Sequence, residues 1–143
     1  MTQRTQIPSV LDSAQYLPSH VRSNPRIWVT FSVPGIHRYP NAPDEVAYLR
    51  NEHRHIFQYK VTLEVTHDNR EVEFHMLKNE LTGLFKSGVV KADYKSCEML
   101  ASDVMDYLDK NYPNRYAEVD VSEDGECGAT LIRKVHYHPT VGA

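Results

Sequence analysis

The stretch that decides the fold is Phe57-Gln58-Tyr59-Lys60-Val61-Thr62-Leu63-Glu64-Val65, in which apolar and polar residues alternate throughout. Successive side chains of a β-strand point to opposite faces, so the odd-numbered residues here share one apolar face. The even-numbered residues form a polar face. The stretch therefore predicts a strand that packs one face against a hydrophobic core.

Similar alternation occurs before and after this strand. Residues 27–33 predict a first strand, which Pro34-Gly35 should end with a bulge or turn just before His37. Residues 117–123 and 129–135 predict two more strands, joined by a hairpin turn at residues 124–128. Four strands are thus expected, two on each side of a central segment.

The central segment shows helical spacing. One helix is expected from about residue 74, and a second begins at Ser96, a good N-cap, with Glu98 in its first turn. The expected apolar stripes consist of Phe74, Leu77, Leu81 and Leu84 in the first helix, and Leu100, Val104, Tyr107 and Leu108 in the second. The predicted order is strand, strand, helix, helix, strand, strand, which is an α+β fold.

The chain of 143 residues is long enough for one domain with its own core. We assign the domain to residues 26–135. Residues 1–25 are polar, contain three prolines and predict a flexible arm. Residues 136–143 predict a tail, in which His136 and His138 are interpreted as tail residues rather than a metal site.

Composition argues against several classes of function. The net charge is −3 and the basic residues are scattered, so neither nucleic acid nor a membrane surface is an expected partner. No apolar run approaches a membrane span, and the first residues lack the pattern of a signal peptide. Cys97 and Cys127 make no disulfide framework. These features favour a reduced, cytoplasmic protein.

Three histidines provide the clearest functional signal. His53 and His55 form an H-x-H pair at the start of a strand, which places both side chains on one face about 6–7 Å apart. His37, at the end of the neighbouring strand, completes a cup of three nitrogens. Three neutral imidazoles with a vacant fourth position are the ligand set of a catalytic zinc. The alternative is a chance grouping of surface histidines.

These segments resemble the family of 6-pyruvoyl-tetrahydropterin and 6-carboxy-tetrahydropterin synthases, which adopts the tunnelling fold, or T-fold. The resemblance covers roughly residues 27–133. It is carried in order by five segments: Phe31 to Pro40, Glu52-His53-Arg54-His55-Ile56-Phe57, Val72-Glu73-Phe74-His75-Met76-Leu77-Lys78, Ser96-Cys97-Glu98-Met99-Leu100-Ala101 and Val121-Ser122-Glu123.

The resemblance implies a four-stranded antiparallel sheet with two helices on one face, and zinc bound by His37, His53 and His55. It also implies that Glu123 anchors a pterin, since one carboxylate can accept both a ring N–H and an exocyclic amine. Glu98 would be a second ligand contact, with Cys97 beside it. The alternatives are a solvated acid next to a hairpin for Glu123 and a helix-terminal charge for Glu98.

Other positions depart from the family's pattern. Leu49 stands where the resemblance implies a catalytic cysteine, and residues 87–95 cannot supply the family's Asp-His loop. Arg54 replaces the glycine between the two ligands and is expected to bring a cation near the pocket. Glu52 and Asp93 are the remaining candidates for proton transfer. The expected catalytic residues are therefore unknown.

Two functions remain open from sequence. One is a zinc-dependent enzyme acting on a reduced pterin such as dihydroneopterin triphosphate. The other is a binding protein that holds a pterin, purine or related nucleotide without turnover. A homo-oligomer is expected in both cases, because a four-stranded sheet leaves open edges that copies can close into a β-barrel. The resemblance implies trimers or hexamers.

Overall fold

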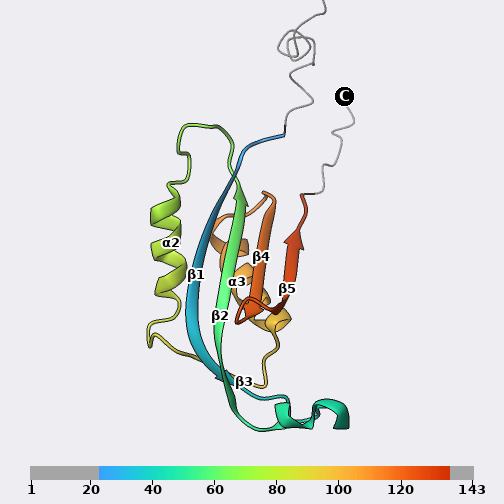
Figure 1. The fold of residues 1–143 in the computed structure, drawn as a ribbon. Coiled ribbons are helices and arrows are strands. Elements are labelled where there is room, and N and C mark those ends of the chain that lie inside the picture. Colours follow the sequence, from blue (N-terminus) through green and yellow to red (C-terminus); the bar gives the residue numbers. More distant parts are fainter. Residues whose placement is uncertain (1–22, 136–143) are drawn as a thin grey trace, which may run out of the picture.

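The computed structural model describes residues 23–135. Five strands, two α-helices and one 3₁₀ helix follow one another along the chain: β1 Arg26–His37, η2 Asp44–Arg50, β2 His53–Glu64, α2 Phe74–Gly83, β3 Val90–Asp93, α3 Cys97–Asn111, β4 Ala117–Glu123 and β5 Cys127–Arg133 (Figure 1). Among these residues, no helix is long and apolar enough to cross a membrane. The predicted tail, with His136 and His138, and the first 22 residues of the predicted arm lie outside the described part.

The elements form one sheet of five strands in the order β3-β1-β2-β4-β5. The pairs β1–β2, β2–β4 and β4–β5 are antiparallel, as the fold prediction requires. The prediction of four strands is wrong, because β3 adds a parallel strand beside Gly35 and His37. This strand has only four residues, with Val90 and Ala92 buried, and so short an alternation gives little signal in sequence.

The expected break at Pro34-Gly35 does not occur. β1 continues through both residues to His37, and its register with β2 is uninterrupted. A Cβ atom at Gly35 would lie 2.5 Å from the ring of Phe57, so glycine is needed there for close packing rather than for a turn. A register shift between Ile36 and His37 does appear, but on the side facing β3. The first histidine is therefore held inside a regular strand.

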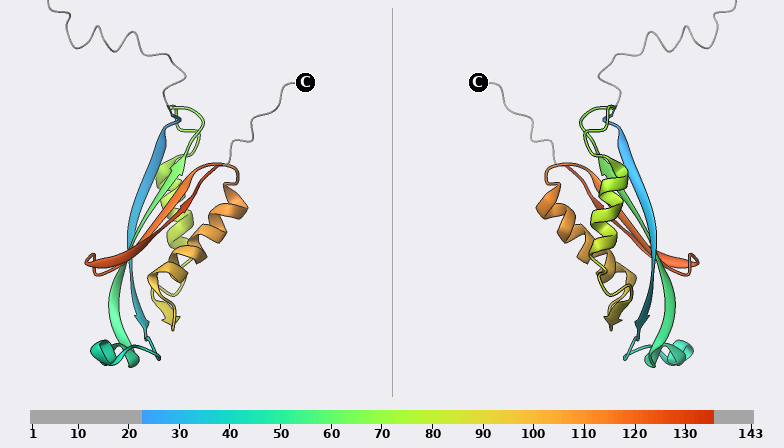
Figure 2. Two further views of the ribbon diagram at one scale, coloured as in Figure 1. Left: turned by 90° about the vertical axis from the view of Figure 1, so that its right-hand side faces the viewer. Right: turned by 90° about the vertical axis from the view of Figure 1, so that its left-hand side faces the viewer.

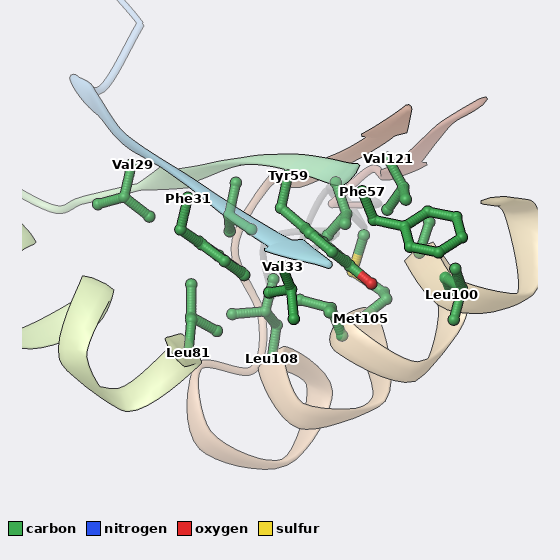
Figure 3. Packing of buried hydrophobic residues seen from close by; sticks show 14 of the residues in the cluster. Val29, Phe31, Val33, Phe57, Tyr59, Leu81, Leu100, Met105, Leu108 and Val121 are labelled. Atoms are coloured by element: carbon green, nitrogen blue, oxygen red, sulfur yellow. The ribbon is translucent and has the colours of Figure 1, made fainter. Parts of the chain in front are cut away.

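Both α-helices cover one face of the sheet, and the core lies between the two layers (Figure 2). α3 buries Leu100, Val104 and Leu108 of its predicted stripe, while Tyr107 is only partly buried. The Ser96 side chain caps the helix by accepting a hydrogen bond from the Met99 N–H. In α2 only Leu77 and Leu81 are buried. The core cluster drawn in Figure 3 combines these residues with the odd-numbered residues of β1 and β2.

The predicted stripe of α2 was too wide. Phe74 is 46% exposed and Leu84 is 43% exposed, so the ends of this stripe face away from the core. Phe74 is the first residue of the helix, and Leu84 lies just past its last residue, Gly83. Residues in these positions extend beyond the part of α2 that packs on the sheet.

Candidate metal centre

The candidate site is a continuation of the core face of the sheet. In β2, His53 and His55 lie four and two residues before Phe57, so strand alternation places all three side chains on the same side of the sheet. His37 has the same parity as the buried residues of β1, and it is the register partner of His53. The site thus lies at the end of the sheet where β1 finishes and β2 begins, near β3 in Figure 1.

The three histidines converge as the sequence predicts. Their ring centroids are 4.5 Å apart for His37 and His53, 5.1 Å for His37 and His55, and 4.9 Å for His53 and His55. One ring nitrogen from each residue lies within 4.8 Å of the others, so the cluster could hold a metal ion. His37 is buried, whereas His53 and His55 are half-buried.

Each histidine uses its Nδ1 atom in a contact away from the cup. The Nδ1 atom of His37 lies 3.0 Å from the backbone oxygen of Lys95, and that of His53 lies 2.8 Å from the backbone oxygen of Asn51. The Nδ1 atom of His55 lies 2.6 Å from a carboxylate oxygen of Asp124. These oxygens accept hydrogen bonds, so each Nδ1 donates and leaves the Nε2 lone pair free. Metal-binding histidines are oriented in this way.

Asp124 is a site residue that the sequence analysis missed, because it was assigned only to the hairpin turn. Its Oδ1 atom accepts a hydrogen bond of 2.8 Å from the Ile56 N–H, while its Oδ2 atom accepts from His55. These two bonds, that from His55 above all, lower the pKa of the Asp124 carboxyl below its usual range. The residue has a left-handed backbone, with φ 56°. Only the pairing of β2 with β4 brings it to His55.

Glu123 faces the imidazoles directly. Its Oε1 atom lies 3.1 Å from Nε2 of His37, and its Oε2 atom lies 3.5 Å from Nε2 of His55. Both Nε2 atoms are buried, and neither has a hydrogen-bond partner within residues 23–135. Unpaired buried nitrogens whose lone pairs converge on one point are what a cation-binding site requires. The donor set therefore fits a metal ion.

A pocket of about 490 Å³ adjoins the cup. The sequence-predicted site residues His37, His53, Cys97, Glu98 and Glu123 all line this pocket, although they come from four different elements. Its volume is in the range of small-molecule sites. The structure thus brings the metal cup and both predicted ligand carboxylates to one place.

The two cysteines differ in their surroundings within the pocket. Cys97 is buried at the start of α3, and burial, with a further contribution from nearby Glu123, raises the pKa of its thiol to about 11. The thiol is therefore neutral at ordinary pH and is a poor nucleophile. Cys127 is exposed and also lines the pocket, which its assignment to the Gly-rich turn did not predict.

The arginine that lines the pocket is Arg38 and not Arg54, which the sequence analysis expected there. Arg54 is exposed, and strand alternation points it away from the face that carries His53 and His55. Arg38 lines the pocket instead, with its Nε atom 3.4 Å from a carboxylate oxygen of Asp93. Neither Asp93 nor Glu52, the acids considered for proton transfer, lines the pocket. Leu49 does line it, so the position expected to carry a cysteine is an apolar part of the wall.

No protein-family model matches the chain, and no curated protein matches it either. The family resemblance stays a prediction.

Proposed function

We propose that this protein is a zinc-dependent enzyme of the T-fold type that acts on a small heterocycle, such as a reduced pterin. One observation supports this above the others: one ring nitrogen from each of the three histidines lies within 4.8 Å of the others beside a ligand-sized pocket, while their Nδ1 atoms contact oxygen acceptors. A bound zinc would act as a Lewis acid on substrate oxygens. The surrounding residues orient the ligand and limit the access of water.

Glu98 is the residue best suited to recognise the ring. It lies in the first turn of α3, lines the pocket, and its side chain makes no hydrogen bond or ion pair among the described residues. A free carboxylate of this kind can accept two neighbouring N–H groups of a pterin or guanine edge. The resemblance assigns the same task to Glu123, whose position against the histidines supports another role, argued below.

A second candidate function is binding without turnover. It is favoured by Leu49, which gives the pocket an apolar wall where the resemblance implies a cysteine, and by the absence of Glu52 and Asp93 from the pocket lining. Leu49→Cys tests this candidate. Turnover of a reduced pterin by the wild type contradicts binding alone, whereas a wild type that binds the pterin but turns it over only as Leu49→Cys, or not at all, supports it.

The proposed function is tested by metal content and by product analysis. Protein purified without added metal should contain about one zinc per chain, and His37→Ala/His53→Ala/His55→Ala should contain none. Reduced pterins and guanine nucleotides are then incubated with the wild type, and products are separated by mass. Zinc in the wild type without any product favours binding alone. Full zinc occupancy in the triple variant contradicts the site.

We further propose that copies of the chain pair through their sheet edges. β3 covers β1 only from Gly35 to His37, so β1 has one unpaired edge over residues 26–34. β5 is the other edge strand of the sheet. Open edges are normally protected, and the pairing of β1 with β5 of a neighbour would protect both. A trimer or hexamer is expected by sedimentation at micromolar concentration, and a sample containing only the 16.5 kDa monomer contradicts it.

A further inference from the structure

We propose that Glu123 is a fourth protein ligand of the metal ion, so that three histidines and one glutamate form the coordination sphere. The inference rests on the metal-binding part of the proposed function. It goes beyond that function because the carboxylate is assigned to the ion and not to the heterocycle.

The distances are those between neighbouring ligands of one ion. A zinc ion has metal–nitrogen and metal–oxygen distances of about 2.0–2.2 Å, and a tetrahedral angle then separates two ligand atoms by roughly 3.4 Å. The Glu123 oxygens lie 3.1 Å from Nε2 of His37 and 3.5 Å from Nε2 of His55. Glu123 therefore contacts two of the three histidines at the spacing that a shared ion imposes.

The contact calls for a positive charge between Glu123 and the two imidazoles, which a proton on Nε2 or a bound metal ion would supply. Nδ1 of His37 and of His55 is engaged by an oxygen acceptor, so the neutral ring presents a lone pair at Nε2. A carboxylate placed against two lone pairs is repelled by both. A metal ion between them turns this repulsion into three favourable contacts, and it satisfies nitrogens that are otherwise buried without a partner.

Glu123 has no other task among the described residues. Its side chain is 30% exposed and forms no hydrogen bond or ion pair within residues 23–135 apart from its contacts with the two histidines. Its place at the end of β4 is set by its pairing with Phe57 in β2, since the same register brings Asp124 to His55. Two adjacent residues thus serve the site in different ways: Glu123 binds the ion, and Asp124 positions a ligand.

Binding of Glu123 to the ion would limit how a substrate can reach the metal. Four protein ligands fill a tetrahedral site, so a substrate oxygen must either displace Glu123 or raise the coordination number to five, which zinc accepts. The carboxylate that recognises a ring is then Glu98, which lines the same pocket. Loss of Glu123 should lower the affinity for the metal ion, whereas loss of Glu98 should lower only the affinity for the heterocycle.

The experiment measures the zinc affinity of purified protein by competition with a chromogenic chelator, without any organic ligand. Glu123→Gln removes the anionic ligand with little change of shape, and the dissociation constant for zinc should rise at least about 10-fold. Glu126→Gln, an exposed acid of the same hairpin outside the pocket lining, is the matched control and should stay within about twofold of the wild type. The visible spectrum of the cobalt-loaded protein should change for Glu123→Gln only, because it reports the ligands of the ion.

The outcomes separate the inference from the proposed function. Thermal unfolding of each metal-free variant shows that the fold is retained, and Glu123→Asp provides a second variant that keeps the charge. If the wild type and Glu123→Gln bind zinc equally and have the same cobalt spectrum, the inference is overturned even when pterins are processed. A weaker zinc site in Glu123→Gln supports it, whether or not any pterin is turned over. A wild type that binds no zinc overturns both.

Discussion

Two halves of the same sheet face differ in chemistry but not in geometry. At one end of β2, Val61 and Leu63 point into a dry core between the sheet and the helices. At the other end, His53 and His55 point the same way, in the same alternation. Phe57 lies at the boundary, with its ring centroid 5.2 Å from that of His37 and 5.8 Å from that of His55. A continuous strand thus carries packing and a candidate site side by side.

The difference shows what each half must satisfy. Aliphatic side chains need only close contact, so the core half is specified by shape and burial. The imidazoles carry polar atoms, and each of them requires a partner when it is buried. Main-chain oxygens and Asp124 meet half of this need at the Nδ1 atoms. At Nε2 of His37 and of His55 the need is unmet among the described residues.

Leu63→Ala should have the largest effect and should act on stability alone. Leu63 is fully buried, so the substitution leaves a cavity and should lower the free energy of unfolding by about 2–5 kcal/mol. The residue lies eight positions along β2 from His55, about 26 Å away, so the zinc affinity of the folded protein should not change. Urea unfolding and zinc competition measure the two quantities. A large loss of zinc affinity would show that the two halves of the face are coupled.

Gly35→Ala tests the boundary between the halves. Its Cβ atom would meet the Phe57 ring at 2.5 Å and the Val90 backbone oxygen at 3.1 Å, and the buried ring has little room to move. We expect a loss of about 1–3 kcal/mol in the free energy of unfolding, together with weaker zinc binding, because Phe57 packs against two of the histidines. Gly83→Ala is the control, since nothing lies within 4 Å of its Cβ position. Equal stability of the two variants in urea would contradict this account of Gly35.

Asp124→Asn should act on the site alone. Asparagine tolerates the left-handed backbone at this position, so the turn is kept, but the charged acceptor for His55 is lost. Zinc affinity should fall roughly 10-fold, the lower end of the range for residues that orient a metal ligand. Asp120→Asn, on the face of β4 that points away from the core, should leave the zinc affinity unchanged. Chelator competition on both variants decides whether Asp124 positions the histidine.

Ser96→Ala should have the smallest effect, and on stability only. Ser96 lines the pocket but caps α3, and loss of an N-cap costs about 1 kcal/mol. Zinc affinity should stay the same because the residue contacts none of the histidines. Ser102→Ala, on the exposed side of α3, should not destabilise the protein. If Ser96→Ala weakened zinc binding as much as Asp124→Asn, the pocket wall and the metal cup would form one cooperative unit.

The sequence predicted the elements better than their connections. Alternation and helical spacing located the long strands and both α-helices, and the H-x-H spacing predicted that His53 and His55 share a face with His37 nearby. The short strand β3 and the continuation of β1 through Pro34-Gly35 were missed. Both depend on partners distant in the chain, since Gly35 packs against Phe57 and pairs with Val90.

What the sequence determined by itself is the pattern on each strand: which residues face the core, and that the three histidines belong to the same face as the apolar residues. That follows because strand periodicity is a property of the local chain. Tertiary structure alone decided which nitrogen of His37 and of His55 is engaged, that Asp124 holds His55, and that Glu123 lies against these two histidines. These contacts join residues at least 58 positions apart, so they exist only once β1, β2, β3 and β4 are paired in register.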